Sequence, residues 1–378
     1  MTKAVKPKSI PDGWDVRKLG EILKLNYGKG LPADNRIEGK YPVYGSNGVV
    51  GSHNQCLVKT EGIIVGRKGS AGLVHYSKNP FYPIDTTFYI TQEDTSLHLP
   101  YLFYLLNYCK LSKIKGDVGV PGLNREMAYL EKVMYPPFFE QHNIAHILSK
   151  IQSAIEAQEK IIQTTTELKK ALMQKFFTEG LKGEAQKETE IGLVPKSWQV
   201  IGLGDVFELT SGKTRPTELT PMPKNGFLYP VYGGNGVLGY SKESLIDFKT
   251  IVLGRVGAYC GNVYLTDNKS WISDNALYAK VFLRECDLYY LSVALKGLNL
   301  NRLRNTGGQP LISQSIVYSQ KIAFPKIDEQ IEIAKTLEQT DKKINMAIEK
   351  KNVLQSLFKS MLHHLMTGQI RVKDLRFS

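Results

Sequence analysis

The chain has 378 residues, enough for several folded domains, and its 42% hydrophobic and 22% charged residues are ordinary for a folded protein. Its net charge of +13 at pH 7 favours an acidic polymer or an anionic surface as partner, although a merely basic protein without such a partner stays an alternative. The four cysteines form no C-x-x-C pair, so a disulfide framework is not expected. The first residues lack the apolar core of a signal peptide, and no apolar stretch reaches about 18 residues, so neither secretion nor a membrane span is expected. We therefore expect a reduced, cytoplasmic protein.

The first part of the chain, up to residue 137, is rich in glycine, tyrosine, valine, asparagine and proline. Apolar runs at residues 62–65 (GIIV) and 87–90 (TFYI) are bounded by turn-forming residues and predict β-strands. Asn47-Gly48 predicts a tight turn, because both residues tolerate positive φ. Residues 99–108 carry apolar and aromatic side chains at helical spacing, so we predict a helix buried against a sheet and a mixed α/β globule.

A long helix is predicted after Pro137, because residues 140–179 contain neither glycine nor proline. The apolar positions advance in steps of four and three residues, which is the coiled-coil period. Such a narrow seam with charged flanks is buried most simply against one partner helix. The predicted stripe is Ile144, Leu148, Ile151, Ile155, Gln158, Ile162, Thr165, Leu168, Leu172 and Phe176.

The chain then repeats itself. Residues 180–190 are polar and predict a linker into the second copy. Residues 41–51 (YPVYGSNGVVG) return as residues 229–239 (YPVYGGNGVLG), and residues 63–67 (IIVGR) return as 251–255 (IVLGR). The second long stripe is Ile333, Leu337, Thr340, Ile344, Ala347, Lys351, Leu354, Phe358, Met361 and Leu365.

These elements predict an α+β protein with an internal pseudo-twofold repeat. Two globular α/β domains, residues 1–137 and 183–325, are joined by two long antiparallel coiled-coil helices, residues 138–182 and 326–378. The alternative is two tandem domains whose helices each pack on their own globule. The residues that we expect to form the seam between the helices are Ile144, Leu148, Ile151, Ile155, Ile162, Leu172, Ile333, Leu337, Ile344, Leu354, Met361 and Leu365.

Two segments resemble catalytic motifs and both are incomplete, and the histidines form no metal site. Residues 210–214 (TSGKT) end like a phosphate-binding loop, but Phe207 stands where its first glycine is required. Residues 135–138 (YPPF) resemble the tail of the Asn/Asp-Pro-Pro-Tyr/Phe loop of amino-methyltransferases, but Tyr135 cannot accept the amino proton of a base. The histidines do not recur between the copies and have no metal-ligand spacing. The sequence therefore predicts no catalytic centre, no bound cofactor and no metal.

The remaining signal is a basic, tyrosine-rich pair of turn-rich modules, which is typical of nucleic-acid binding. Arg67 and Arg255 lie in matching Gly-Arg-x-Gly turns, where a guanidinium can pair with phosphate or guanine, or can anchor the fold on an internal carboxylate such as Asp85 or Asp274. Both interpretations stay open. The predicted DNA contacts are Lys29, Arg36, Asn47, His53, Arg67, Lys68, Asn124, Arg125, Lys213, Arg215, Asn235, Arg255, Arg302, Arg304, Gln309 and Gln314.

The order of these motifs resembles one known family over the whole chain, the DNA-specificity subunit of type I restriction-modification systems. Residues 10–14 (IPDGW) and 194–198 (VPKSW) open the two modules, and residues 137–141 (PFFEQ) and 325–330 (PKIDEQ) open the two helices. The turn at residues 66–69 (GRKG) and the helix ends at residues 172–178 and 361–368 fit as well.

The resemblance implies two target recognition domains, each reading one half of a bipartite site on double-stranded DNA. It implies helices that set the spacer and dock two methyltransferase subunits, with endonuclease subunits joining, and S-adenosylmethionine bound on those partners. This chain would then be a non-catalytic scaffold. Two rival functions are a self-contained DNA-modifying enzyme with an unrecognised site and a structural coiled-coil adaptor.

Overall fold

The computed structural model describes residues 10–114, 122–305 and 310–376. The chain forms two compact units, which we call unit 1 (residues 1–160 and 348–378) and unit 2 (residues 161–347). Each unit combines a mixed α/β module with part of both long helices, α4 (Phe138–Glu179) and α7 (Ile327–Met366). Within the described residues, no helix combines the length and apolarity needed to cross a membrane.

The core of unit 1 is built around one central strand, β5, in a four-stranded antiparallel sheet of order β2-β8-β5-β6. Its side chains alternate between the two faces, as the period of a strand requires. Ile63 and Val65 pack with residues of α2, which covers one face, whereas Ile64 packs with Val58 and Phe81 on the other. Burial on both faces explains the uninterrupted apolar run in the sequence.

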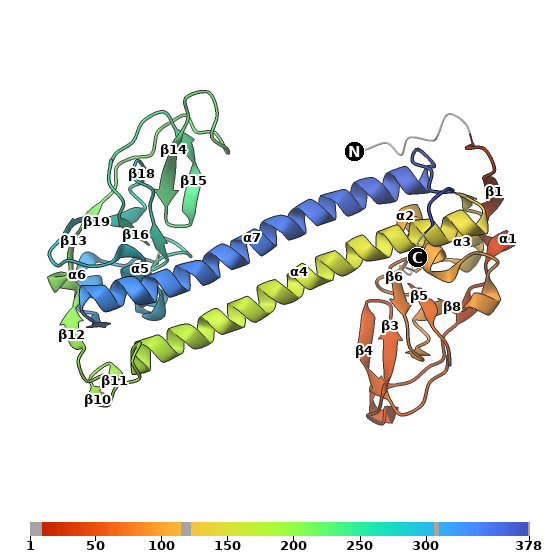
Figure 1. Cartoon of the computed structure of the whole chain (residues 1–378), viewed down its shortest axis with the longest axis horizontal. Helices are drawn as coiled ribbons and strands as arrows, with labels where there is room; N and C mark the ends of the chain where they lie inside the picture. The colour runs from red at the N-terminus through yellow and green to blue at the C-terminus, as the bar shows by residue number, and fades with distance from the viewer. Residues whose placement is uncertain (1–9, 115–121, 306–309, 377–378) are drawn as a thin grey trace. The chain divides into compact units, whose positions relative to one another are not determined.

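A smaller sheet of order β4-β3-β7 completes the module, and β1 pairs with β9 beside the start of α4. The elements of unit 1 (Figure 1) are β1 (Asp15–Lys18), α1 (Leu19–Ile22), β2 (Asn26–Tyr27), η1 (Ala33–Asn35), β3 (Tyr41–Gly45), β4 (Gly48–His53), β5 (Gly62–Gly66), β6 (Val74–Ser77), β7 (Tyr82–Pro83), β8 (Thr87–Ile90), η2 (Gln92–Asp94), α2 (Leu99–Cys109), η3 (Leu111–Lys113), α3 (Arg125–Tyr129) and β9 (Lys132–Tyr135).

Unit 2 repeats this arrangement. Its four-stranded sheet has the order β13-β19-β16-β17, its three-stranded sheet the order β15-β14-β18, and β12 pairs with β20. The elements of its module are β10 (Gln186–Thr189), β11 (Gly192–Pro195), β12 (Gln199–Gly202), η4 (Leu203–Asp205), β13 (Phe207–Ser211), β14 (Tyr229–Gly233), β15 (Gly236–Ser241), β16 (Ile251–Gly254), β17 (Val263–Leu265), β18 (Trp271–Ile272), β19 (Ala276–Phe282), α5 (Leu288–Gly297), η5 (Leu300–Leu303), α6 (Gln314–Tyr318) and β20 (Lys321–Phe324).

The duplicated segments of the sequence form duplicated hairpins. Residues 41–51 and 229–239 become β3–β4 and β14–β15, each with an irregularity at the same place, after Val43 and after Val231. Gly48 and Gly236 take φ values of +108° and +82° at the turns, a conformation that disfavours any side chain. The predicted turns, strands and buried helices are therefore confirmed. The predicted linker at residues 180–190 is wrong in part, because β10 within it pairs with β11.

In unit 1 the beginning of α4 and the end of α7 pack together and against the module (Figure 1). Ile144 and Leu148 share one apolar cluster with Leu365, Met361 and Phe358. Lys351 pairs with Glu159 and Arg371 pairs with Glu140, so the two helices run antiparallel in this unit. The alternative in which each helix packs only on its own globule is wrong here, since α7 follows the second module and ends on the first.

In unit 2 the end of α4 and the beginning of α7 contact the second module in the same way. Leu172 and Phe176 pack with Ile333, Leu337 and the module residue Trp198. The predicted stripe needs one correction, because Leu168 is 52% exposed. Lys169 takes the inward place instead and pairs with Asp341 of α7 at 2.5 Å. Each of the twelve predicted seam residues is buried or half-buried.

A buried glutamine fixes the start of each long helix to its module. Gln141 donates to the Pro136 carbonyl at 2.8 Å and accepts from the His98 backbone N–H at 2.8 Å. Gln330 makes the same two bonds, at 2.9 Å to the Pro325 carbonyl and at 3.0 Å from the Asp287 N–H. The Glu-Gln pair of the sequence repeat thus satisfies backbone groups that the turn into the helix would otherwise leave buried and unpaired.

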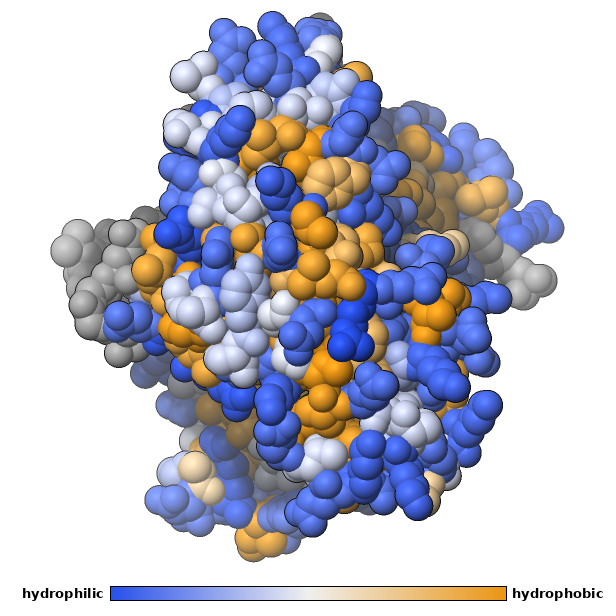
Figure 2. Space-filling view, turned by 90° about the vertical axis from the view of Figure 1, so that its left-hand side faces the viewer, coloured by the Kyte–Doolittle hydropathy of each residue, from blue (hydrophilic) through white to orange (hydrophobic). Residues whose placement is uncertain are grey.

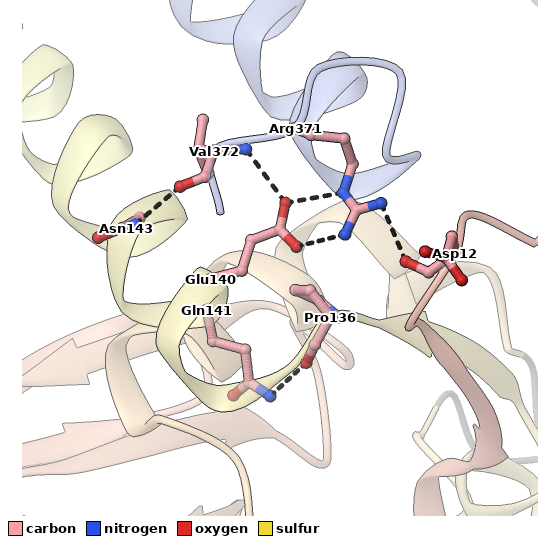
Figure 3. Close-up of polar contacts among 7 residues, drawn as sticks. All are labelled: Asp12, Pro136, Glu140, Gln141, Asn143, Arg371 and Val372. Atoms are coloured by element: carbon pink, nitrogen blue, oxygen red, sulfur yellow. Dashed lines mark hydrogen bonds and ion pairs between the residues drawn. The ribbon is translucent and has the colours of Figure 1, made fainter. Parts of the chain in front are cut away.

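The glutamate before each glutamine receives the end of the other long helix. Figure 3 shows Glu140 accepting two bonds from the guanidinium of Arg371, both at 2.9 Å, and one from the Val372 N–H at 3.1 Å. Burial by itself opposes ionisation of Glu140, but these bonds and the arginine charge lower the pKa of its carboxyl. In unit 2, Glu329 accepts instead from the Leu181 N–H and from Trp198 Nε1, each at 3.0 Å.

The Glu140–Arg371 pair yields a stability prediction. Arg371→Ala leaves the Glu140 side chain, which is 1% exposed, without its charge partner. We expect unfolding free energy to fall by about 2–3 kcal/mol, less than for a fully buried pair because Arg371 keeps some contact with water. A carboxyl whose pKa is lowered on folding stabilises the protein above its unfolded pKa of about 4.3, and this stabilisation is lost as the pH falls. We therefore expect the difference in unfolding free energy between the wild type and the variant to shrink in acid.

Denaturant titration of the full chain at pH 7 and pH 4 measures this difference. The control is Lys321→Ala, which removes an exposed pair with Glu190 and should change stability by less than about 0.5 kcal/mol. If both variants lose the same unfolding free energy, or if the loss for Arg371→Ala grows as the pH falls, then Glu140 is not the ionised partner of Arg371 that we describe.

Candidate nucleic-acid interface

Three loops meet around the arginine turn of unit 1. The Thr86 carbonyl accepts from Ser46 Oγ at 2.6 Å, from Arg67 N at 2.8 Å and from Lys68 N at 3.1 Å. The Leu123 N–H donates to the Arg67 carbonyl at 2.8 Å. The turn of the β3–β4 hairpin, the turn after β5 and the segment before α3 are thereby held together, and we call them the loop surface of unit 1.

The loop surface of unit 2 is built on the same backbone frame. Arg255 N donates to the Asn275 carbonyl at 2.9 Å, and the Ile312 N–H donates to the Arg255 carbonyl at 3.0 Å. The segment before α6 therefore lies against the turn after β16, as its counterpart does in unit 1. Because the backbone bonds of these loops are the same, we expect the two modules to differ in the side chains that the loops carry.

Arg67 lies over an aromatic platform. Its guanidinium carbon is 5.2 Å from the ring centre of Tyr27 and 6.0 Å from that of Phe88. The side chain makes no hydrogen bond and no ion pair with another described residue, and its Nε is buried without a partner. A cation above aromatic faces is held by their quadrupoles and keeps its outer nitrogens for a ligand.

Arg255 has a different partner. Its Nη1 donates to Ser211 Oγ at 2.9 Å. Among the described residues, neither Arg255 nor Arg67 pairs with a carboxylate, so the anchor on Asp85 or Asp274 that we considered is wrong. Both uncompensated guanidiniums lie at the loop surface, which suits an anionic ligand.

Eight other predicted contacts are exposed and stay available to a ligand. Asn47 and Asn235 occupy the hairpin turns, and Lys68 follows Arg67 directly. Lys29 and Lys213 follow the first strand of each four-stranded sheet. The other exposed members are Arg215, Arg302 and Arg304.

Four predicted contacts are engaged within the fold. Arg36 donates to the carbonyls of Leu31 and Val50, at 3.3 and 2.8 Å, and so ties its loop to β4. His53 is 8% exposed, and its Nδ1 accepts from the Ile37 N–H at 3.0 Å. The remaining two are Asn124, which caps α3 by accepting from Met127 N, and Gln314, which donates to the Leu209 carbonyl.

Gln309 lies outside the described residues. Tyr27 and Ser211, which contact the two arginines, were missed as site residues by the sequence analysis. The available signal was their position, since each directly precedes the repeated Gly-Lys pair at residues 28–29 and 212–213. Because one is a tyrosine and the other a serine, the sequence did not indicate that each contacts the repeated arginine of its own copy.

The surface of unit 2 is mixed in character. Figure 2 shows apolar residues in a broken band among hydrophilic ones on the side of the molecule that faces left in Figure 1. Exposed apolar side chains of this unit include Leu193, Val281 and Leu283.

No cluster of three or more histidine, cysteine, aspartate or glutamate residues with metal-binding geometry occurs in the described part of the chain. The cysteines Cys109 and Cys286 are poor nucleophiles, since burial raises their thiol pKa values to about 12 and about 11. The loop surfaces thus offer positive charge and hydrogen-bond donors, which are the means of binding a polyanion.

Comparison with known proteins agrees with this chemistry. The family described as type I restriction modification DNA specificity domain matches the chain twice, over residues 11–166 and 195–356. The type I restriction enzyme MjaVIII specificity subunit of Methanocaldococcus jannaschii is 26% identical over 97% of this chain and 95% of its own length. The putative MjaX specificity subunit of the same organism is 27% identical over 96% and 95%.

Among solved structures, the S subunit of a type I restriction-modification system from M. genitalium has the same fold. Its TM-score is 0.76 at 18% sequence identity, and the match covers 96% of this chain and 98% of that one.

The geometry separates two predicted contacts of unit 1. We expect Lys68→Ala to weaken DNA binding roughly fivefold, about 1 kcal/mol, with an unchanged melting temperature. Arg36→Ala should instead speed amide hydrogen exchange in residues 31–36 and leave DNA affinity per folded molecule unchanged, because its guanidinium is bonded to backbone carbonyls. The reverse pattern would show that Arg36 turns outward to DNA.

Proposed function

Because this chain belongs to the type I restriction-modification DNA specificity family, whose role is DNA target recognition, we propose that its two modules read the two different halves of a bipartite site on double-stranded DNA. Residues 1–137 form the first reading module and residues 183–325 the second. The loop surfaces carry the DNA contacts, and the long helices set the distance between the half-sites.

One observation supports this proposal above the others. The two loop surfaces share their backbone bonds, from Leu123 to Arg67 and from Ile312 to Arg255, but present different side chains around the arginine. A common frame with different contacts is what two unequal half-sites require, because phosphate contacts position a reader while base contacts specify it.

We also propose that the chain itself is not catalytic. Its relatives are specificity subunits, a role without catalysis in this family. Its phosphate-loop-like and methyltransferase-like segments lack the residues that the chemistry needs, at Phe207 and Tyr135. Methyl transfer and cleavage then belong to two methyltransferase subunits and to endonuclease subunits that assemble on the helices.

Sequencing of methylated bases in cells that express this chain with its methyltransferase subunit tests the proposal. We expect one motif with two different halves and a fixed spacer. A short contiguous motif would contradict the reading by two modules. Methylation or cleavage of DNA by the purified chain alone, supplied with S-adenosylmethionine or Mg²⁺, would instead establish the rival enzyme function.

The helices yield a second prediction. Seven residues inserted after residue 160 of α4 and seven after residue 347 of α7 keep the coiled-coil register, since seven residues are close to two turns. The insertion adds about 10 Å, which corresponds to roughly three base pairs. We expect the methylated motif to keep both halves and to gain a longer spacer. A motif with its original spacer would show that the helices do not set the distance.

A further inference from the structure

The two modules differ at one place where their frames are the same. In unit 1 the Leu25 N–H donates to the Tyr129 hydroxyl at 2.8 Å, and in unit 2 the Leu209 N–H donates to the Tyr318 hydroxyl at 2.7 Å. This repeated bond fixes the short helix, α3 or α6, against the first strand of the sheet. Positions next to it can therefore be compared between the modules residue by residue.

In unit 1 these positions hold two arginines and a tyrosine. The guanidinium carbons of Arg67 and Arg125 lie 5.2 and 5.1 Å from the same Tyr27 ring centre. Arg125 is also 5.8 Å from the ring centre of Tyr129. Tyr27 is 50% exposed, so the pair of cations lies at the surface rather than in the core.

In unit 2 the same positions are neutral apart from one arginine. Ser211 stands in place of Tyr27 and accepts from Arg255, and Gln314 stands in place of Arg125 and donates to the Leu209 carbonyl. The second cation and the aromatic platform are both missing. The difference is one of charge as well as of shape.

Two guanidiniums on one ring repel each other unless an anion lies between or beside them. The described carboxylates offer little compensation. Only Glu126 pairs with either arginine, through Arg125 Nε at 3.2 Å, and its side chain is 72% exposed, so water screens the pair. The charge of the pair in unit 1 is therefore largely uncompensated by the described carboxylates.

We propose that Arg67, Arg125 and Tyr27 form a clamp for one DNA backbone phosphate, present in the first module and absent from the second. The inference rests on the proposed function, because it names the part of DNA that this loop surface holds. A phosphate shares its charge over several oxygens and can accept from both guanidinium forks. The clamp positions the first module on its half-site and does not itself read sequence.

A guanine edge is the other acceptor that arginine commonly pairs with, and the site fits it less well. Guanine is neutral, so its approach would remove water from two like charges without compensating them. Arg67 is also half-buried with its Nε covered, so it offers a ligand its outer nitrogens, and phosphates on the outside of a duplex reach these more easily than base edges in a groove do.

The test measures the salt dependence of DNA binding by the full chain assembled with its methyltransferase subunits. The probes are a duplex that carries the methylated motif and a duplex of unrelated sequence. For Arg125→Gln, which introduces the residue found in the second module, we expect the slope of log K against log salt to fall in magnitude by about 0.9. Affinity for both duplexes should fall by the same factor.

A reciprocal variant and a matched control complete the design. Ser211→Tyr with Gln314→Arg should increase the magnitude of the slope by up to about 0.9, because it rebuilds the clamp in the second module. Arg17→Gln changes an exposed arginine on β1, away from the loop surface, and should leave the slope unchanged. Circular dichroism confirms that each variant is folded.

Three outcomes overturn the inference. Loss of affinity for the motif duplex alone would mean that Arg125 reads a base. An unchanged slope and affinity in folded Arg125→Gln would mean that the pair does not touch DNA, while DNA recognition by the wild-type complex would still stand. Failure of the wild-type complex to bind either duplex would reject the proposed function, and the clamp with it.

Discussion

A buried glutamine at the start of each long helix is the constraint on which the rest of the structure depends. Gln141 and Gln330 each bond to a proline carbonyl before the helix and to a backbone N–H at the start of the buried helix of the module. Both ends of the glutamine amide are satisfied, so the bond fixes the direction in which the helix leaves the sheet. The preceding glutamate then accepts from the segment that follows the other long helix, through Arg371 in unit 1 and through Leu181 in unit 2, where it also accepts from Trp198 of the module.

With the helices fixed in this way, each module can change its loops without changing its attachment. In both units the arginine turn and the segment before the short helix are joined by a backbone hydrogen bond, and in unit 1 Ser46 of the hairpin turn donates to the same Thr86 carbonyl as the arginine turn. Such a frame imposes few demands on side chains. The same frame therefore carries two arginines on a tyrosine in one module and an arginine on a serine in the other. This separation of frame from contact is what the proposed reading of two unequal half-sites requires.

Periodicity and duplication made the architecture predictable. The uninterrupted apolar run of β5, the Asn-Gly turns and the four-and-three spacing of the helices all depend on local rules that hold in any context. The prediction was less accurate at two places in the chain. Leu168 was chosen by hydropathy, but the four-and-three spacing continues at position 169, where Lys169 pairs with Asp341. Residues 186–189 looked like a linker because their strand is polar and pairs only with the next one.

The sequence predicted the chemistry of the candidate site better than it predicted which residues form it. Repeated arginine turns in a basic chain indicated DNA contact, but hydrogen-bond capacity alone could not separate a free arginine from an engaged one. Arg36 and Arg67 look equivalent in the sequence, and only the fold shows that Arg36 donates to carbonyls while Arg67 lies over rings. Tyr27 was missed because tyrosine is as common in a core as in a binding site.

The claim that each module reads its own half-site independently is tested most directly by a hybrid chain. In this hybrid, residues 195–325 are replaced by a second copy of residues 11–137, and the methylated motif is determined by sequencing in cells that supply the methyltransferase subunit. The account predicts a motif with two identical halves, both equal to the first half of the wild-type motif. A motif that retains the second wild-type half would contradict it, because sequence would then be read by parts of the chain outside the exchanged module.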